Sequence, residues 1–362
     1  MTPHPQLGTE PAPPPGANDA SRALLQRLRA IVGSEHVVDH PHQLKTYESD
    51  GLLQYHVRPR AVVLPATTQE VSQVVRACHE HEVPWVARGS GSGLSGGALP
   101  VDDGILVALT RMNRILEIDL ENQRVVCQPG VTNIAISNAV GPEFFYPPDP
   151  SSQIVCSIGG NVAENSGGAH CFKYGFTTHY VCGLEIVLHD GTIVRLGGKA
   201  LDQPGYDLIG AFVGSEGTLG VATEVTVRIV PSPEAVRTLV AFFPTPRAAG
   251  EVVSAVVTGG VVPAAIEMMD NLTIRASEEM ANAGWPTDVG AALVIELDGA
   301  ESECDTQFER VRALCAEHDA LDVQVAASEE ERALIWRMRK AAFPAMGRLY
   351  PSYYVQDGVI PR

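Results

Sequence analysis

The sequence predicts an α+β protein built in two parts, and three patterns lead to this expectation. Short apolar strands and amphipathic helices alternate near the start, glycine-rich segments separate the strands that follow, and strands and helices alternate regularly in the last third. Pro231 and Pro233 separate the second pattern from the third. The 362 residues are enough for two domains, each with its own core.

The N-terminal segment predicts a disordered tail over residues 1–21. Its first 19 residues are rich in proline and poor in large apolar side chains, so they bury too little surface to offset the entropy of ordering. A helix is expected next, because Leu24, Leu28 and Val32 recur on one helical face.

A strand–helix–strand unit follows. Residues 61–64 form a short apolar strand, Thr67 and Glu70 offer a capping box for a helix that ends near residue 81, and residues 83–87 form the next strand. The Asp190-Gly191 pair predicts a hairpin turn. The remaining elements expected in this part are a helix over 131–140 and strands over 105–109, 115–119, 124–128, 184–189, 192–196 and 223–230.

The part after Pro233 alternates strands with longer helices. We expect strands over 238–243, 291–297 and 323–326, a further strand before residue 271, and helices over 247–258, 271–283, 301–317 and 329–342. The change of pattern places the domain boundary between residues 232 and 233, giving domains over 22–232 and 233–362.

Charge and cysteine content narrow the class of protein. Lys plus Arg number 26 against 43 Asp plus Glu, and the net charge of −17 repels phosphate backbones, so nucleic acid is not an expected partner. The seven cysteines form no CxxC pair and predict buried thiols in a reducing compartment, which favours the cytoplasm. We find no apolar run of 18 residues and no secretory signal, so we expect membrane contact only through partners.

The glycine-rich segment at 88–97 predicts a binding site for a diphosphate. Gly91, Gly93 and Gly96 match the dinucleotide fingerprint. A nicotinamide-binding turn must open directly into a helix, however, and Pro100 and Gly104 would break a helix here, which argues against nicotinamide binding. Backbone amides without Cβ atoms in the way still form an anion-binding nest. The alternative is a surface loop without a ligand, and the glycine clusters at 157–161 and 214–220 argue against it.

Several long motifs in series resemble one flavoprotein family. They are Arg88-Gly89-x-Gly91-x-Gly93, Pro129-Gly130, Pro148-Asp149-Pro150-Ser151-Ser152, Ser157 with Gly159-Gly160-Asn161 and Glu164-Asn165-Ser166-Gly167-Gly168, Gly214-Ser215-Glu216-Gly217-Thr218-Leu219-Gly220, and Asp357-Gly358-Val359-Ile360-Pro361-Arg362. In this order they are similar to the vanillyl-alcohol oxidase / p-cresol methylhydroxylase group, and within it to the FAD-linked subunits of glycolate oxidase and to D-lactate dehydrogenases. The resemblance runs from about residue 22 to the end of the chain.

This resemblance implies a two-subdomain FAD-binding domain of the p-cresol methylhydroxylase type, followed by a partial ferredoxin-like cap. Some relatives attach the flavin to a histidine of the first glycine loop, and Ser92 stands at that position, which implies noncovalent FAD. The residues implied to bind it are Arg88, Gly89, Ser90, Gly91, Ser92, Gly93, Leu94, Ser95, Pro129, Gly130, Pro148, Asp149, Ser152, Ser157, Gly160, Asn161, Asn165, Gly167, Gly217 and Val221.

The activity implied is that of an FAD-dependent 2-hydroxy-acid dehydrogenase. A short D-2-hydroxy acid, glycolate or D-lactate, would be oxidised to the 2-oxo acid, with hydride transfer from Cα to flavin N5 and electrons passed to an acceptor other than oxygen. Arg339 matches the arginine that binds the substrate carboxylate, a task that suits a permanently charged, bidentate group. Phe343 and Val355 occupy the positions where dicarboxylate-specific relatives hold a second carboxylate, which favours a monocarboxylic substrate.

The family continues beyond the motif at 357–362 into a histidine-rich segment that supplies active-site histidines and, in some members, a divalent metal. The last histidine here is His318, so the resemblance implies a C-terminally shortened chain without the expected base. We expect no metal site, and we do not expect His170 to be the base. The implied partners are a second FAD-type subunit and an iron–sulfur subunit; the alternative is a non-catalytic FAD-binding or assembly subunit.

Overall fold

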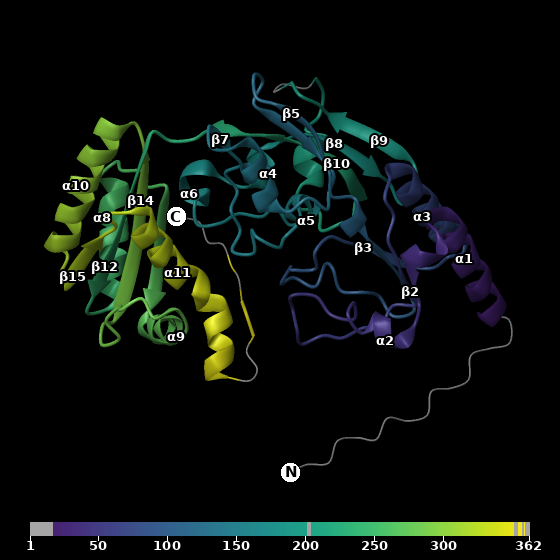
Figure 1. Cartoon of the computed structure of the whole chain (residues 1–362), viewed down its shortest axis with the longest axis horizontal. Coiled ribbons are helices and arrows are strands. Elements are labelled where there is room, and N and C mark those ends of the chain that lie inside the picture. The colour runs from purple at the N-terminus through teal and green to yellow at the C-terminus, as the bar shows by residue number, and fades with distance from the viewer. Residues whose placement is uncertain (1–16, 201–203, 351–353, 357, 359–362) are drawn as a thin grey trace, which may run out of the picture.

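The structure is a computed structural model that describes residues 17–200, 204–350, 354–356 and 358. Figure 1 shows two lobes, one built from the elements up to β11 and a second, in green and yellow, that starts with β12. The predicted boundary between residues 232 and 233 falls between β11 (Val230–Pro231) and β12 (Ala235–Phe243). We keep it as our proposed domain boundary.

The first sheet has the strand order β1-β2-β4-β3, with β2, β4 and β3 parallel. Its elements are α1 (Ala17–Val32), β1 (Val37–Val38), α2 (Pro41–Leu44), β2 (Ala61–Val63), α3 (Thr68–Glu80), β3 (Trp85–Arg88) and β4 (Ile105–Ala108). Apolar residues of α1 and α3 share one core with the strands, while Leu44 of α2 packs in another. Thr67 caps α3 as predicted, because its side chain accepts a hydrogen bond from the Glu70 amide.

One prediction in this region is wrong. The expected tail over 1–21 overlaps α1, which already begins at Ala17. The helix starts directly after the breakers Pro15 and Gly16, so the residues that follow extend the amphipathic helix toward the N-terminus. Residues 1–16, the rest of the predicted tail, lie outside the described residues.

The second sheet is antiparallel, in the order β5-β6-β10-β8-β9. Its strands are β5 (Ile115–Asp119), β6 (Arg124–Cys127), β8 (Val181–Val187), β9 (Ile193–Gly197) and β10 (Val221–Arg228). The helices of this part are α4 (Asn133–Val140), α5 (Ile158–Glu164), α6 (Cys171–Tyr174) and α7 (Leu208–Phe212). The predicted hairpin turn is present between β8 and β9, where Gly191 adopts a φ of +84°.

Short elements account for most of what the sequence pattern missed here. They are α2, α5, α6, α7, the strands β1, β7 (Phe144–Phe145) and β11, and the 3-10 turns Ser34–His36, Leu109–Arg111 and Thr177–His179. The glycine-rich segment after Ser157 forms helix α5, because the Ser157 side chain accepts a hydrogen bond from the Gly160 amide and caps its first turn. The sequence pattern had predicted no helix in this glycine cluster.

The second lobe contains an antiparallel sheet in the order β13-β14-β12-β15. Its elements are β12, α8 (Pro246–Thr258), β13 (Ala265–Asp270), α9 (Asn271–Ala281), β14 (Ala291–Gly299), α10 (Glu301–Glu317), β15 (Asp322–Val325) and α11 (Glu329–Leu349). Two strand–helix–strand units in this order form a ferredoxin-like sheet. Apolar side chains of α8 and α10 cover one face, and those of α9 and α11 cover the other.

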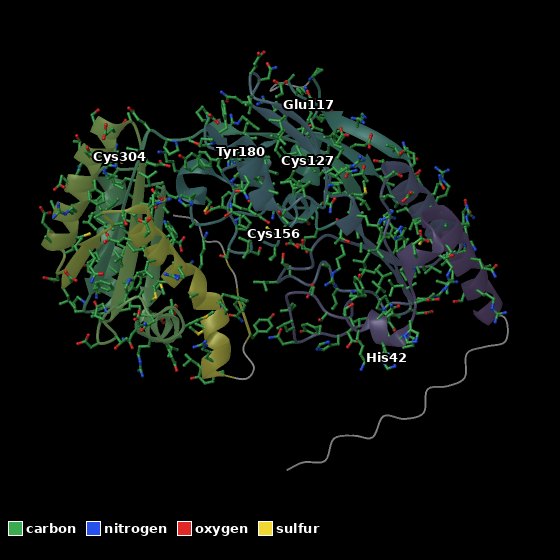
Figure 2. All side chains as sticks on the ribbon, viewed as in Figure 1. His42, Glu117, Cys127, Cys156, Tyr180 and Cys304 are labelled. Carbon is green, nitrogen blue, oxygen red and sulfur yellow. The ribbon has the colours of Figure 1, made fainter. Side chains whose placement is uncertain are left out.

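The cysteines behave largely as predicted. All seven are free; five are buried, and Cys171 and Cys182 are half-buried. Figure 2 shows Cys304 far from Cys127 and Cys156. None of the helices in the described part of the chain combines the length and apolar composition that a membrane crossing requires.

The core of the second lobe gives a test of the fold. Leu239 on β12 is fully buried, whereas Leu53 is 67% exposed. We expect Leu239→Ala to lower the free energy of unfolding by about 2 to 5 kcal/mol, since it removes apolar contacts and leaves a cavity. Leu53→Ala is the matched control and should change it by less than about 0.5 kcal/mol. Urea unfolding followed by circular dichroism measures both, and equal effects would contradict this packing.

Candidate functional site

The glycine-rich segments meet around one cleft in the first lobe. Its volume is about 930 Å³, part of it open to solvent, and it is bordered by β3, the loop after it, α5 and the start of β10. The predicted cofactor residues that line it are Arg88, Gly89, Ser90, Gly91, Ser92, Gly93, Pro129, Ser152, Ser157, Gly160, Asn161, Gly217 and Val221. Segments more than 100 residues apart in the sequence therefore converge on one cleft.

The geometry at the glycines fits a ligand that lies against the backbone. A Cβ on Gly89 would meet the Ser157 Oγ at 2.1 Å, and one on Gly159 would meet the Pro129 Cβ at 2.6 Å. At Gly93, by contrast, the nearest atom would be Glu164 Oε1 at 3.5 Å. The first loop therefore packs tightly onto α5 on one side and leaves open space on the other, which is the cradle that a diphosphate-containing cofactor such as FAD requires.

Seven of the predicted cofactor residues lie outside the lining of the cleft. They are Leu94, Ser95, Gly130, Pro148, Asp149, Asn165 and Gly167. Ser95 donates to Glu164 Oε2 at 3.3 Å, and Asn165 holds the left-handed position at the end of α5 while its Oδ1 accepts from the Thr178 amide. Pro148 accepts a hydrogen bond from Asn133 through its carbonyl. Direct contact of these residues with the cofactor stays a prediction.

Arg88 supports the first loop with its side chain. Its guanidinium donates to the carbonyls of Tyr47 and Ser49, at 3.2 and 2.7 Å. A Cβ on Gly91, whose φ is +70°, would lie 2.3 Å from Arg88 Nη2. Only glycine therefore allows the loop to cross this close above the guanidinium.

Two carboxylates in the cleft were not predicted. Glu164 and Glu216 both line it, and burial together with the negative charge of Glu216 raises the pKa of Glu164. A carboxyl group that takes up a proton more readily repels an anionic ligand less. Glu216 lies inside the glycine cluster at 214–220, and Glu164 lies in the family motif that ends at Gly168, so these positions were the available signal.

Arg339 lies outside this cleft lining, on α11. Its Nε donates to Glu267 Oε2 on β13 at 2.6 Å, and its Nη2 lies 2.5 Å from the same oxygen. Among the described residues, Glu267 is its hydrogen-bond partner, and 32% of the Arg339 side chain is exposed. The structure thus gives the predicted carboxylate-binding arginine an internal carboxylate as partner.

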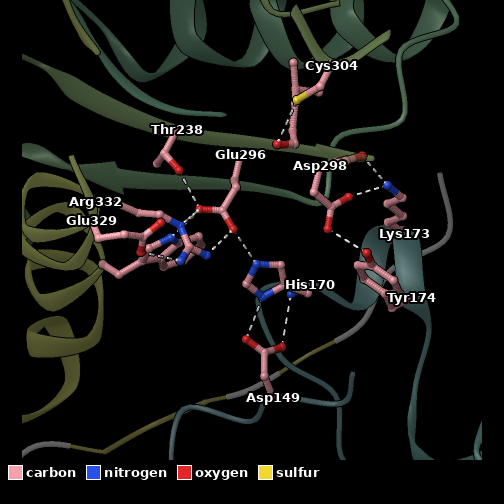
Figure 3. A network of polar contacts seen from close by, with 12 residues as sticks. Asp149, His170, Lys173, Tyr174, Thr238, Glu296, Asp298, Cys304, Glu329 and Arg332 are labelled. Atoms are coloured by element: carbon pink, nitrogen blue, oxygen red, sulfur yellow. Dashed lines mark hydrogen bonds and ion pairs between the residues drawn. The ribbon is translucent and has the colours of Figure 1, made fainter. Parts of the chain in front are cut away.

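Asp149, a residue predicted to contact the cofactor, binds His170 through its carboxylate (Figure 3). Its carboxylate lies 2.7 Å from His170 Nδ1, and His170 Nε2 lies 3.0 Å from Glu296 Oε1 on β14. Burial alone would lower the pKa of His170, but the hydrogen bonds to the two carboxylates outweigh burial and raise the pKa to about 9. A raised pKa favours the protonated form of His170 at neutral pH, and this form has no free lone pair with which to accept a proton.

Comparison with known proteins agrees with this architecture. The family described as "FAD binding domain" matches residues 59–197, and the family "FAD linked oxidases, C-terminal domain" matches residues 232–362. The glycolate oxidase subunit GlcD of Escherichia coli K12 is 48% identical over 94% of this chain and 68% of its own length, and that of Bacillus subtilis 168 is 42% identical over 94% and 73%. The solved structure of p-cresol methylhydroxylase shares the fold, with a TM-score of 0.75 at 18% identity over 90% of this chain and 70% of its own.

These findings define the class of protein as an FAD-linked oxidoreductase. The chain belongs to the family of FAD-linked oxidases that includes the glycolate oxidase subunit GlcD. The predicted family, the α+β fold of the p-cresol methylhydroxylase type and FAD as cofactor are thereby confirmed.

The open space beside Gly93 leads to a prediction about cofactor affinity. Gly93→Ala should leave the stability of the FAD-free protein unchanged, because the new Cβ meets no protein atom closer than 3.5 Å. It should weaken FAD binding by about tenfold or more, since the methyl group occupies cofactor space. Thermal unfolding of the FAD-free protein and quenching of FAD fluorescence measure the two effects.

Gly250→Ala on α8 is the matched control, because nothing lies within 4 Å of its Cβ position and it is remote from the cleft. Unchanged FAD affinity in Gly93→Ala would show that the first glycine loop does not contact the cofactor.

Proposed function

We propose that this protein oxidises a short D-2-hydroxy acid, glycolate or D-lactate, to the 2-oxo acid, and that the electrons pass to an acceptor other than oxygen. The observation that carries the proposal is the 48% identity to a glycolate oxidase subunit over 94% of the chain, which includes all three glycine segments that form the cleft. D-lactate dehydrogenase from Anaerostipes hadrus, 33% identical over 88% of the chain, supports the wider substrate class.

The residues of the cleft would hold FAD noncovalently, with the backbone of residues 88–93 at the diphosphate and Ser92 in place of an attaching histidine. When bound, FAD supplies the two-electron acceptor that this chain's side chains lack. The glycine loop, α5 and the start of β10 fix the position of the cofactor, and the cleft reduces its contact with water.

Arg339 would bind the substrate carboxylate. Glu267 engages Nε and Nη2, and no described residue accepts a hydrogen bond from Nη1. A guanidinium carries five N–H donors, so Glu267 can orient the group while its remaining donors receive a second carboxylate. Phe343 lies one helical turn further along α11 and, like Val355, carries no group that could bind a second substrate carboxylate, which supports a monocarboxylic substrate.

The proton of the substrate hydroxyl must go to a base other than His170, because both ring nitrogens of that residue are hydrogen-bonded to carboxylates. We propose that the histidine-rich segment implied by the family resemblance provides it. We further propose partners of the kind implied there, a second FAD-type subunit and an iron–sulfur subunit, in a cytoplasmic complex that reaches the membrane through them. The description of both GlcD relatives as subunits supports assembly with other chains.

The visible absorption spectrum tests the proposed function. We expect the purified protein to show a flavin band, and a form that carries the histidine-rich segment to lose that band on anaerobic addition of glycolate or D-lactate. A band that no hydroxy acid bleaches in either form would favour the alternative, a non-catalytic FAD-binding or assembly subunit. Absence of the band in both forms would contradict the cofactor site.

Substitution of Arg339 tests the substrate contact. Arg339→Lys keeps the positive charge but loses the planar pair of donors, so kcat/KM for glycolate should fall by about 10- to 100-fold, mainly through KM. The control is Arg337→Lys, an exposed arginine on the same helix, which should leave both constants unchanged. Steady-state kinetics of the form that carries the histidine-rich segment, with an artificial electron acceptor, measure the change. Equal constants for the two variants would remove Arg339 from the site.

A further inference from the structure

A buried network of charges joins the two lobes (Figure 3). His170, at the start of α6, lies between Asp149 of the first lobe and Glu296 of the second. The backbone amide of His170 also donates to Asp149 Oδ1 at 3.2 Å. The neighbouring Ala169 packs against the apolar core of the second lobe, on the face of its sheet that α9 and α11 cover. His170 therefore extends from the first lobe into the second.

Glu296 is saturated with hydrogen-bond donors. Its Oε1 accepts from His170 and from Arg332 Nη2, and its Oε2 accepts from Arg332 Nε, Thr238 Oγ1 and Trp336 Nε1, all between 2.6 and 3.0 Å. The residue is 2% exposed. Such a buried carboxylate is stable only while its donors stay in place, so it fixes β12, β14, α11 and His170 relative to one another.

The first-lobe end of the network is continuous with the cofactor cleft. A Cβ on Gly168 would lie 2.0 Å from the Asp149 carbonyl oxygen, so the chain before His170 and the chain at Asp149 are in direct contact. Ser152 and Ser166, a few residues away on the same two segments, line the cleft. His170 is thus anchored to the two segments that border the cleft.

The other end leads to Arg339. Arg332, Trp336 and Arg339 are spaced i, i+4 and i+7 and share one face of α11. Arg332 and Trp336 bind Glu296, and the His170 ring lies 5.3 Å from the Trp336 ring. The orientation of this helix face, and with it that of Arg339, therefore depends on the Glu296 cluster.

We propose that His170, as an imidazolium bridging Asp149 and Glu296, is a positioning residue that fixes helix α11, and so Arg339, relative to the cofactor cleft. The link to catalysis rests on the proposed function. The positioning of α11 itself does not, and it can be measured without substrate.

The charge on His170 sets the pH range of the bridge. Asp149 faces the ring from the loop before α5, Glu296 from β14, and Arg332 and Trp336 from α11, while Glu267 of β13 faces the adjacent Cys171.

The pKa of His170 is raised to about 9. The contribution of its charge to stability is therefore complete below about pH 6.5, its ordinary pKa, and is lost as the pH rises through 9. Burial would raise the pKa of Glu296, but His170 and Arg332 hold it well below the usual range, so the Glu296 contribution is complete above about pH 4.5 and falls under more acid conditions.

Three variants separate this role from general stabilisation. His170→Gln keeps a polar side chain but removes the charge, His170→Arg keeps the charge and supplies two donor edges, and His179→Gln is the matched control. His179 accepts from the amide of Phe176, a contact within the first lobe.

Hydrogen exchange of FAD-free protein at pH 7 is the first readout. We expect peptides from residues 329–349 to exchange at least about tenfold faster in His170→Gln, while His170→Arg and the control stay close to wild type. Unchanged exchange in these peptides would overturn the proposal whatever the enzyme does. In wild-type protein, the 15N signals of the His170 ring, assigned by their loss in His170→Gln, should titrate near pH 9; a midpoint below 7 would likewise overturn it.

Kinetics provide the second readout. In His170→Gln, kcat/KM for glycolate should fall by about 10- to 100-fold at pH 7, while FAD affinity stays within about twofold of wild type. Wild-type kcat/KM should decline above pH 9 in a step that His170→Arg lacks. These kinetic measurements use the form that carries the histidine-rich segment. If that form oxidises no hydroxy acid, the proposed function fails, but hydrogen exchange still decides the positioning role. If the peptides of α11 exchange faster in His170→Gln and the variant keeps full activity, the proposed effect of α11 positioning on substrate binding by Arg339 is wrong.

Discussion

The carboxylate of Glu296 is the group on which the arrangement of the two lobes depends. It sits on β14, in the centre of the sheet of the second lobe, between β12 and β13, where apolar side chains surround it. A charge in such surroundings is strongly destabilising unless its hydrogen bonds are satisfied, and here the donors come from two elements of its own lobe, β12 and α11, and from His170 of the other lobe. Folding of the sheet and docking of the lobes are therefore coupled through one side chain.

A second contact between the lobes helps to hold this arrangement. Asp298, two residues along β14, binds the ammonium group of Lys173 and accepts from Tyr174 Oη at 2.6 Å. Both donors lie on α6, which His170 precedes. The α6 segment thus contacts β14 at Glu296 and at Asp298, and two contacts from one short helix restrict its rotation as well as its distance.

The two carboxylates of the sheet face toward α11 have different surroundings. The register pairs Glu296 with Ala265 and Glu267 with Val294, so Glu267 and Glu296 project from the same face of neighbouring strands. Arg332 and Arg339, separated by two turns of α11, meet one carboxylate each. Glu296, the partner of Arg332, accepts hydrogen bonds from further donors as well. Arg339, in contrast, retains N–H donors that are not engaged by the described residues. The same residue types thus supply a structural contact at one position and an available cation at the other.

The sequence predicted features that depend on local chemistry. Thr67 and Glu70 marked the start of α3, Asp190-Gly191 marked a hairpin, and the glycine segments marked the cleft, because each pattern reports a backbone requirement within a few residues. The pairing of His170 with Glu296 spans 126 residues, and that of Arg339 with Glu267 spans 72. Neither has a local pattern, since the partners meet only after two sheets and α11 have formed. For the same reason the contact of Asp149 with His170 was not predicted, because the histidine comes from the end of another glycine segment.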